Sequence, residues 1–187
     1  MLYGCESWVL YRRLVRRLDE FHMRCLRRID GIKWQDTVPN TEVLRLCGIS
    51  GIEAVLLTAQ FRWVGHVIRM DDNRIPKQIF FGQLSSGKRP QCGPLRCYKH
   101  TVKVNMKRCG LQPKTLTTAA LDRAQWRTTC QSAIRSFEKT RVAELERKRA
   151  ARKQQAVNIT GTAWPCDRCN KICSSRIGLF AHRRTHR

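Results

Sequence analysis

Four residues near the C-terminus have both the donor atoms and the spacing needed to bind a metal ion: Cys166, Cys169, His182 and His186. Two cysteines separated by two residues can direct both sulfurs to one ion. Two histidines four positions apart project from the same face of a helix. Thiolate and imidazole ligands in this combination are typical of structural zinc sites, so the sequence predicts one bound Zn²⁺. The plainer alternative is that these cysteines are reduced thiols beside a basic tail.

Metal binding of this kind needs a small fold that brings the four ligands together. The spacing Cys-x2-Cys-x12-His-x3-His is that of a Cys2His2 zinc finger, and it predicts a ββα unit over residues 161–187. So short a unit cannot bury enough apolar surface to fold without its metal. Trp164 and Leu179 occupy expected core positions, whereas Cys173 replaces the usual second aromatic residue, for which Phe180 could partly compensate. We expect Cys173 to be a small buried thiol, with a role as alternative ligand left open.

The helix of this finger indicates how it would contact nucleic acid. With Leu179 in its usual place, the positions that touch successive bases in such fingers hold Ser175, Gly178 and Ala181. None of these side chains has the bidentate fork that distinguishes base edges. The positive charge of this segment includes that of Arg176, Arg183 and Arg184. We therefore expect contact with phosphates and little choice between base sequences.

The composition of the whole chain agrees with a polyanionic partner. Its 187 residues include 37 Lys and Arg against 14 Asp and Glu, which gives a formal charge of +23. Such a surface attracts nucleic acid, RNA or DNA, in a strongly salt-dependent way. A membrane surface is the competing polyanion, but no long apolar run or lipidation signal supports it. We also expect no small-molecule substrate.

Cysteine usage and a short basic run indicate where the chain functions. No signal peptide opens the sequence, and seven of the ten cysteines are scattered, mostly among apolar helical positions. This pattern predicts a reducing, intracellular compartment. One basic cluster resembles a nuclear localisation signal and favours the nucleus; it consists of Lys148, Arg149, Arg152 and Lys153.

Apolar residues that recur every three or four positions predict a mainly α-helical fold in three parts. We expect a helical domain over residues 1–130, a basic helical linker over 131–160 and the finger over 161–187. In the first part, the periodicity predicts a helix from about Trp8 to Ile29, with Phe21 on its apolar stripe.

Cap residues and breakers predict the limits of the later helices. Asn40 can cap a helix over 41–46, and Ser50-Gly51-Ile52-Glu53 is a capping box that opens the next one. A loop over 82–94 precedes a further helix with Val102 and Met106 inward. The last long helix begins near Leu121 or Asp122, with Trp126, Cys130 and Ile134 on its buried side.

Two sets of basic residues in the helical domain are candidates for nucleic-acid contact. The first forms a ridge along one flank of the first helix: Arg13, Arg17, Arg24 and Arg28. The second lies in a segment without acids: Lys88, Arg89, Arg96, Lys99 and Lys103. Guanidinium and ammonium groups in such rows can follow a phosphate backbone. The alternative for each residue is a solvated surface charge.

Three blocks of the helical domain resemble a known family. Residues 1–8, Met-Leu-Tyr-Gly-Cys-Glu-Ser-Trp, resemble the segment just after the polymerase core of LINE-type (non-LTR) retrotransposon reverse transcriptases. Residues 21–34 and 62–77 resemble the next two blocks in the same order, the last containing Arg-Trp-Val-Gly-His-Val-Ile-Arg-Met. The resemblance covers residues 1–130, and a finger rich in Cys and His is common after the thumb in these elements.

The resemblance implies that residues 1–130 are the thumb and post-thumb region, an irregular helical bundle. In the family this region helps to hold template RNA, primer and target DNA during target-primed reverse transcription. Polymerase chemistry needs clustered aspartates that bind two metal ions, and we find no palm segment before Tyr3 and no endonuclease. Met70-Asp71-Asp72 imitates the aspartate pair, but it follows a helical pattern and is expected in a turn. We expect no catalytic residues and no enzyme activity from this chain.

The leading hypothesis is therefore a zinc-binding, non-catalytic nucleic-acid-binding protein, a C-terminal remnant of a retrotransposon reverse transcriptase. Two alternatives remain: a Cys2His2 transcription regulator in the nucleus, and a module whose finger binds another protein.

Overall fold

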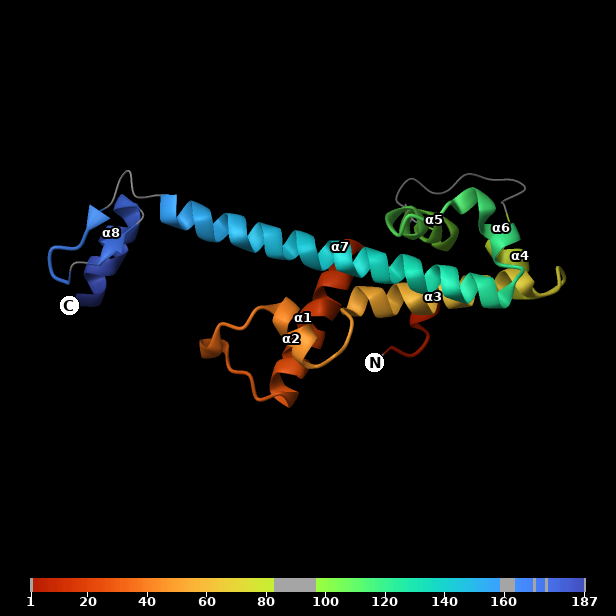
Figure 1. Ribbon diagram of the computed structural model, residues 1–187, viewed down its shortest axis with the longest axis horizontal. Helices are drawn as coiled ribbons and strands as arrows, with labels where there is room; N and C mark the ends of the chain where they lie inside the picture. The colour runs from red at the N-terminus through yellow and green to blue at the C-terminus, as the bar shows by residue number, and fades with distance from the viewer. Residues whose placement is uncertain (1, 83–96, 159–163, 170, 174, 187) are drawn as a thin grey trace, which may run out of the picture. The chain divides into compact units, whose positions relative to one another are not determined.

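The computed structural model describes residues 2–82, 97–158, 164–169, 171–173 and 175–186 (Figure 1). The described residues are mainly helical, as predicted. They divide into two compact units, Met1–Val142 and Ala143–Arg187. Helix α7 (Arg123–Asn158) runs through residue 130 without a break and has residues in both units. The predicted domain limits at residues 130 and 160 stay predictions. Each unit is described by itself.

Helix α3 (Ile52–Arg69) is the centre of the first unit because it is apolar on most of its circumference. It packs with α4 (Ile75–Phe81), α5 (Tyr98–Arg108), α6 (Leu116–Ala119) and the first part of α7 around one core. Phe61, Val64 and Val102 are fully buried there, and Met106 is 1% exposed. Val102 and Met106 thus point inward, as predicted. Short 3-10 turns at Cys5–Ser7, Trp34–Asp36 and Pro113–Thr115 connect or precede these helices.

The contact between α3 and α7 is unusually close. The indole nitrogen Nε1 of Trp126 donates a hydrogen bond of 3.0 Å to the carbonyl oxygen of Phe61. A Cβ atom on Gly65 would lie only 2.3 Å from that nitrogen, so any larger residue here would have to displace the indole. Trp126, Cys130 and Ile134 are all buried, which confirms the predicted inner side of α7.

Helix α1 (Arg12–Ile29) packs against α2 (Asn40–Leu46) through a second, smaller core of Met23, Leu26, Val43 and Leu44. The helix begins four residues later than predicted. Its apolar stripe is also rotated from the predicted one, since Phe21 is 47% exposed and Ile29 is 78% exposed. Which side of α1 is covered depends on where the turn after α1 places α2. The apolar periodicity of α1 alone does not predict that position.

Both predicted helix caps are wrong, because in each case a distant side chain binds the group that the local cap would have used. Asn40 is the first residue of α2, and its Oδ1 accepts a hydrogen bond of 2.8 Å from Arg27. Helix α3 has no side-chain cap of its own; the N–H of Gly51 donates instead to Oε1 of Glu138, at 2.9 Å. Glu53, expected to close the capping box, pairs with two arginines of other helices.

The second unit contains the end of α7 and a small strand–strand–helix arrangement. Strands β1 (Trp164–Pro165) and β2 (Ile172–Cys173) are antiparallel, with Trp164 opposite Cys173. Helix α8 (Arg176–Arg183) follows, and a 3-10 turn at Arg184–His186 extends it. The hydroxyl of Ser175 accepts a hydrogen bond from the N–H of Gly178 at 3.0 Å and so caps α8.

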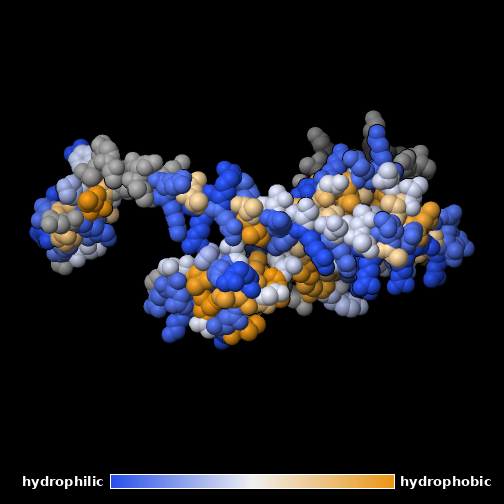
Figure 2. Space-filling model, viewed as in Figure 1, coloured by the Kyte–Doolittle hydropathy of each residue, from blue (hydrophilic) through white to orange (hydrophobic). Residues whose placement is uncertain are grey.

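Hydrophilic side chains cover much of the visible surface of the first unit (Figure 2). Among the described helices, none is both long and apolar enough to cross a membrane.

Candidate metal centre

The four predicted ligands come together in the second unit. Cys166 follows β1, Cys169 lies in the turn between the strands, His182 is in α8 and His186 is in the turn after it. Their ligand atoms all lie within 4.8 Å of one another. The group can therefore hold one metal ion. Cys166 is 1% exposed, which keeps one side of the site away from water.

The distances between donor atoms provide a stricter test of the fit. A tetrahedral zinc ion with sulfur at about 2.3 Å and nitrogen at about 2.0–2.1 Å separates S from N by about 3.6 Å and N from N by about 3.4 Å. Sγ of Cys166 lies 3.6 Å from Nε2 of His186, and Sγ of Cys169 lies 3.1 Å from Nε2 of His182. The two Nε2 atoms are 3.1 Å apart. Each distance is within about half an ångström of the tetrahedral value, so these residues fit a single ion.

The electrostatics of the site also favour metal binding. Desolvation lowers the pKa of His182 below its ordinary value, and the neighbouring His186 and Lys171 lower it further. At neutral pH this imidazole is therefore neutral, which is the form that binds a metal.

Two contacts hold the turn containing the cysteines against the helix containing the histidines. Nε of Arg183 lies 3.2 Å from Oδ1 of Asp167, and Nη1 of Arg168 donates to the carbonyl oxygen of His186 at 3.0 Å. The pKa of Asp167 is lowered, first by its own backbone N–H and then by Arg183. Asp167 is thus ionised when this pair forms.

The apolar core around the centre is thin. Cys173 is buried, as predicted, and lies outside the group of four ligands. The expectation that Phe180 compensates for the missing aromatic residue is wrong, because Phe180 is 65% exposed and lies under the guanidinium of Arg184, 5.1 Å from its ring centre. Phe180 is adjacent to Leu179 in α8 and therefore points about 100° away from it around the helix. A bound metal would supply stability that this core does not.

The three finger arginines predicted to contact phosphates have different surroundings. Arg176 is exposed at the start of α8. Arg183 is paired with Asp167, and Arg184 is stacked on Phe180. Among the described residues, Arg176 has neither an ion-pair partner nor a stacked ring.

The basic residues predicted in the first unit divide by element. All four ridge residues on α1 are exposed, and within the described part of the chain none has an ion-pair partner: Arg13, Arg17, Arg24 and Arg28. On α5, Lys103 is exposed, while Lys99 is half-buried with its Nζ 5.3 Å from the ring centre of Phe81. Lys88, Arg89 and Arg96 lie outside the described residues, as does the predicted loop except for Gly82.

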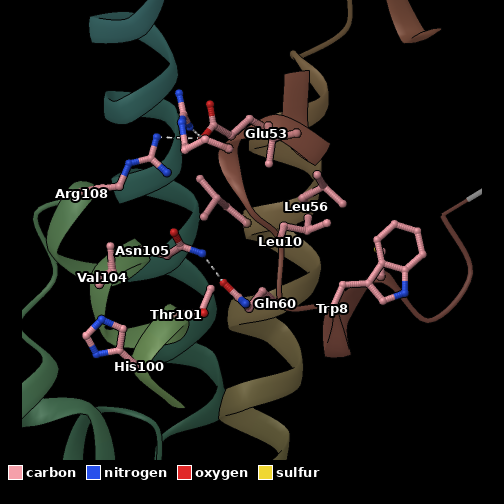
Figure 3. Close-up of a pocket in the computed structure, with 14 residues that line it drawn as sticks. Trp8, Leu10, Glu53, Leu56, Gln60, His100, Thr101, Val104, Asn105 and Arg108 are labelled. Carbon is pink, nitrogen blue, oxygen red and sulfur yellow. Dashed lines mark hydrogen bonds and ion pairs between the residues drawn. The ribbon is translucent and has the colours of Figure 1, made fainter. Parts of the chain in front are cut away.

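Sequence reasoning missed a polar joint between α1, α3 and α5. It surrounds a cavity of about 140 Å³ and is drawn in Figure 3. Glu53 is 9% exposed and pairs with Arg12 and with Arg108, whose Nη2 lies 2.7 Å away. Nearby, the side-chain nitrogen of Asn105 donates to Oε1 of Gln60 at 2.7 Å, as the dashed line in Figure 3 marks. These charged and polar groups form ion pairs and hydrogen bonds with one another, so the joint connects the helices and needs no ligand to pair its polar groups.

The Asp71–Asp72 pair lies in a turn between α3 and α4, as expected. Oδ1 of Asp72 lies 2.7 Å from Nζ of Lys77, and this contact lowers the pKa of the carboxyl group. Because this turn joins two helices, Asp71 and Asp72 do not lie on a strand hairpin, which is where a polymerase carries its aspartate pair.

No family model matches this chain, and neither the curated proteins nor the solved structures contain a match to it.

Proposed function

We propose that this chain binds nucleic acid through phosphates, with a zinc-organised finger as one contact surface and without catalysing a reaction. One observation carries this proposal: the finger helix offers charge but no base-reading side chain. The hydroxyl of Ser175, at the first base-contact position, is used to cap its own helix. Gly178 and Ala181 have no polar side chain, while Arg176 is exposed beside them. Such a helix can bind a backbone without selecting a sequence.

Zinc is the metal we assign to the centre. Two sulfur and two nitrogen donors in a tetrahedron suit Zn²⁺ better than the divalent metals that prefer oxygen ligands. When bound, the ion supplies folding free energy to the finger and no open coordination position for chemistry. The residues that would hold it are Cys166, Cys169, His182 and His186.

The origin that we propose is the thumb and post-thumb region of a LINE-type reverse transcriptase, with a nuclear location. The three sequence blocks in residues 1–130 support this origin, and the helical first unit is compatible with it. An open reading frame upstream that encodes a palm with clustered aspartates would support the origin. Primer extension by the isolated chain should remain at background.

A direct binding measurement tests the proposed function. The zinc-loaded chain is titrated into two fluorescent oligonucleotides of unrelated sequence, and anisotropy gives both dissociation constants. We expect equal affinities within error, and weaker binding to both by Cys166→Ser, whose finger lacks a ligand. Absence of binding, or a preference for one sequence of more than about tenfold, would contradict the proposal.

A protein partner for the finger is the second candidate, because the finger exposes several large apolar side chains. Ile172 is 68% exposed, Ile177 is 82% exposed and Phe180 is 65% exposed. Several exposed large apolar residues on so small a unit favour a protein contact. Loss of a bound protein on Cys166→Ser, with nucleic-acid affinity unchanged, would support this candidate over the first.

A further inference from the structure

The first unit has a basic groove between α3 and the start of α7, apart from the arginine ridge of α1. Two adjoining cavities, of about 550 and 340 Å³, share Arg62, Arg69 and Arg123 in their walls. Arg127 lines the second cavity. The two helices lie side by side in Figure 1. Residues of both helices line the two cavities. We call this feature the α3–α7 groove.

Helical spacing and close packing place these arginines together. Arg62, His66 and Arg69 are four and three residues apart and therefore lie on one face of α3. Arg123 and Arg127 lie on one face of α7 for the same reason. The close approach at Gly65 and Trp126 brings the two faces to a common edge.

One arginine of the groove is held firmly by the protein itself. Nη1 of Arg69 donates a hydrogen bond of 2.6 Å to the carbonyl oxygen of Ala120, at the end of α6. Its position is therefore fixed by α6, and substitution of Arg69 would disturb the fold.

The remaining positive charge of the groove is not neutralised internally. Among the residues that the structure describes, Arg62, Arg123 and Arg127 have no carboxylate within ion-pair distance. Glu6 is the one acidic residue among those that line the two cavities. Like charges held this close repel one another, and a bound anion relieves the repulsion. Guanidinium groups recognise phosphate well, because their planar fork can donate two hydrogen bonds to it.

Two aromatic rings beside the arginines indicate which polyphosphate fits. The ring centres of Trp63 and His66 are 5.6 Å apart, with an angle of 52° between the planes. Trp63 is half-buried and His66 is exposed. Because the rings are tilted, a flat base can stack on only one of them, and His66 is the accessible one. The bases of a duplex are covered by their neighbours, whereas an unpaired base offers its face to an aromatic side chain.

We infer that the α3–α7 groove binds single-stranded nucleic acid, with phosphates against Arg62, Arg123 and Arg127 and a base stacked on His66. This inference rests on the proposed function and adds a site and a strand state to it. A single strand of RNA or of DNA has the required chemistry.

The test compares two double variants, each of which replaces two exposed basic residues by alanine and so removes two positive charges. Arg62→Ala with Arg123→Ala removes two of the four arginines of the groove, whereas Arg135→Ala with Lys139→Ala removes charge from α7 at exposed positions that do not line it. The full zinc-loaded chain is titrated with oligo(dT) and oligo(U) of about 12 nucleotides, and with a duplex of the same length. Thermal unfolding of each variant checks that the first unit remains folded.

We expect the groove variant to lose about tenfold or more in affinity for single strands, and its salt dependence to fall by about 1.4 in log–log slope, since each phosphate contact contributes about 0.7. The control variant should lose less. His66→Ala should weaken single-strand binding by about fivefold, while His66→Phe retains it, because an aromatic face remains. A preference between oligo(dT) and oligo(U) would identify the natural strand.

Two results would overturn the groove while leaving the proposed function intact. One is an equal loss in the groove and control variants, which would mean that total charge alone matters. The other is tighter binding of duplex than of single strands through Arg62 and Arg123. Failure of the unmodified chain to bind any of the oligonucleotides would instead overturn the proposed function.

Discussion

At the start of a finger helix, the hydroxyl of Ser175 could either contact a base or cap the helix. In the structure it caps the helix. The hydrogen bond to the N–H of Gly178 satisfies one of the free donors at the start of α8. That helix contains His182, so the cap and the metal centre stabilise the same element. In so small a unit, a change at one such residue should be measurable in the affinity for zinc.

Ser175→Ala should weaken zinc binding by about fivefold, since loss of an N-cap costs about 1 kcal/mol and folding of the finger is coupled to metal binding. Competition with a chromophoric chelator would measure the change in the full chain. Ser175→Asn should retain the wild-type affinity, because asparagine caps equally well. A loss in both variants would show that the serine has some other role.

Glu138 carries a carboxylate that is held in its ionised form by the fold. Burial raises its pKa, but the hydrogen bonds from Arg141 and from the N–H of Gly51 outweigh burial, so the pKa lies below the ordinary value of 4.5. A carboxyl group with a lowered pKa stabilises the folded state above its unfolded-state pKa. That contribution disappears as pH falls through the folded-state pKa.

Glu138→Gln should therefore destabilise the first unit at neutral pH, by about 1.5–3 kcal/mol for the lost charged hydrogen bonds. The difference from the unmodified chain should shrink as pH falls below 4.5. Urea unfolding followed by tryptophan fluorescence across this range measures it. Glu20, exposed on α1 of the same unit, offers the matched control: Glu20→Gln should change the stability of the first unit little. A difference for Glu138→Gln that is independent of pH would contradict the account.

At the scale of elements, the first unit depends on the contact between α3 and α7. Gly65 leaves room for the indole of Trp126, which donates to the carbonyl oxygen of Phe61. This contact closes the core of the unit and also sets the two faces of the α3–α7 groove.

Gly65→Ala should destabilise the first unit by about 1–3 kcal/mol, because its Cβ would meet the indole. Trp126→Phe should also destabilise it, by loss of the hydrogen bond and of packing. The double variant should lose less than the sum of the two, because the smaller ring makes room for the Cβ atom. Denaturant unfolding of the three variants measures the coupling, and strict additivity would show that the two residues do not touch.

Local patterns predicted some elements well and others badly, for a physical reason. The metal ligands lie within 21 residues, and their spacing reflects the geometry of one ion, so the sequence contains nearly the whole site. The inner side of α7 follows from the helical repeat.

The cap of α3 could not be predicted, because Glu138 lies 87 residues from Gly51 and takes the place that Glu53 was expected to fill. Asn40 does not cap α2, and its Oδ1 accepts a hydrogen bond from Arg27, 13 residues away. Glu53 in turn pairs with Arg12 and Arg108, which lie 41 and 55 residues away. The α3–α7 groove was missed for the same reason, since its arginines come from two separate helices.

At the scale of the whole molecule, charge dominates the expected behaviour. The 37 Lys and Arg residues outnumber the 14 Asp and Glu residues, which leaves a formal charge of +23. The arginines that we propose as phosphate contacts lie on α1, in the α3–α7 groove and on α8, and Arg13, Arg62 and Arg176 are exposed examples. If these surfaces contact phosphates, binding must release counterions and weaken as salt rises.

The most direct test of the central claim, binding through phosphates, is the salt dependence of affinity. The zinc-loaded chain is titrated against a labelled single strand at salt concentrations between about 50 and 200 mM. With six phosphate contacts, each contributing about 0.7 to the slope for a single strand, we predict that affinity falls by about 300-fold over this range, equally for unrelated sequences. An affinity that hardly changes with salt would contradict the claim.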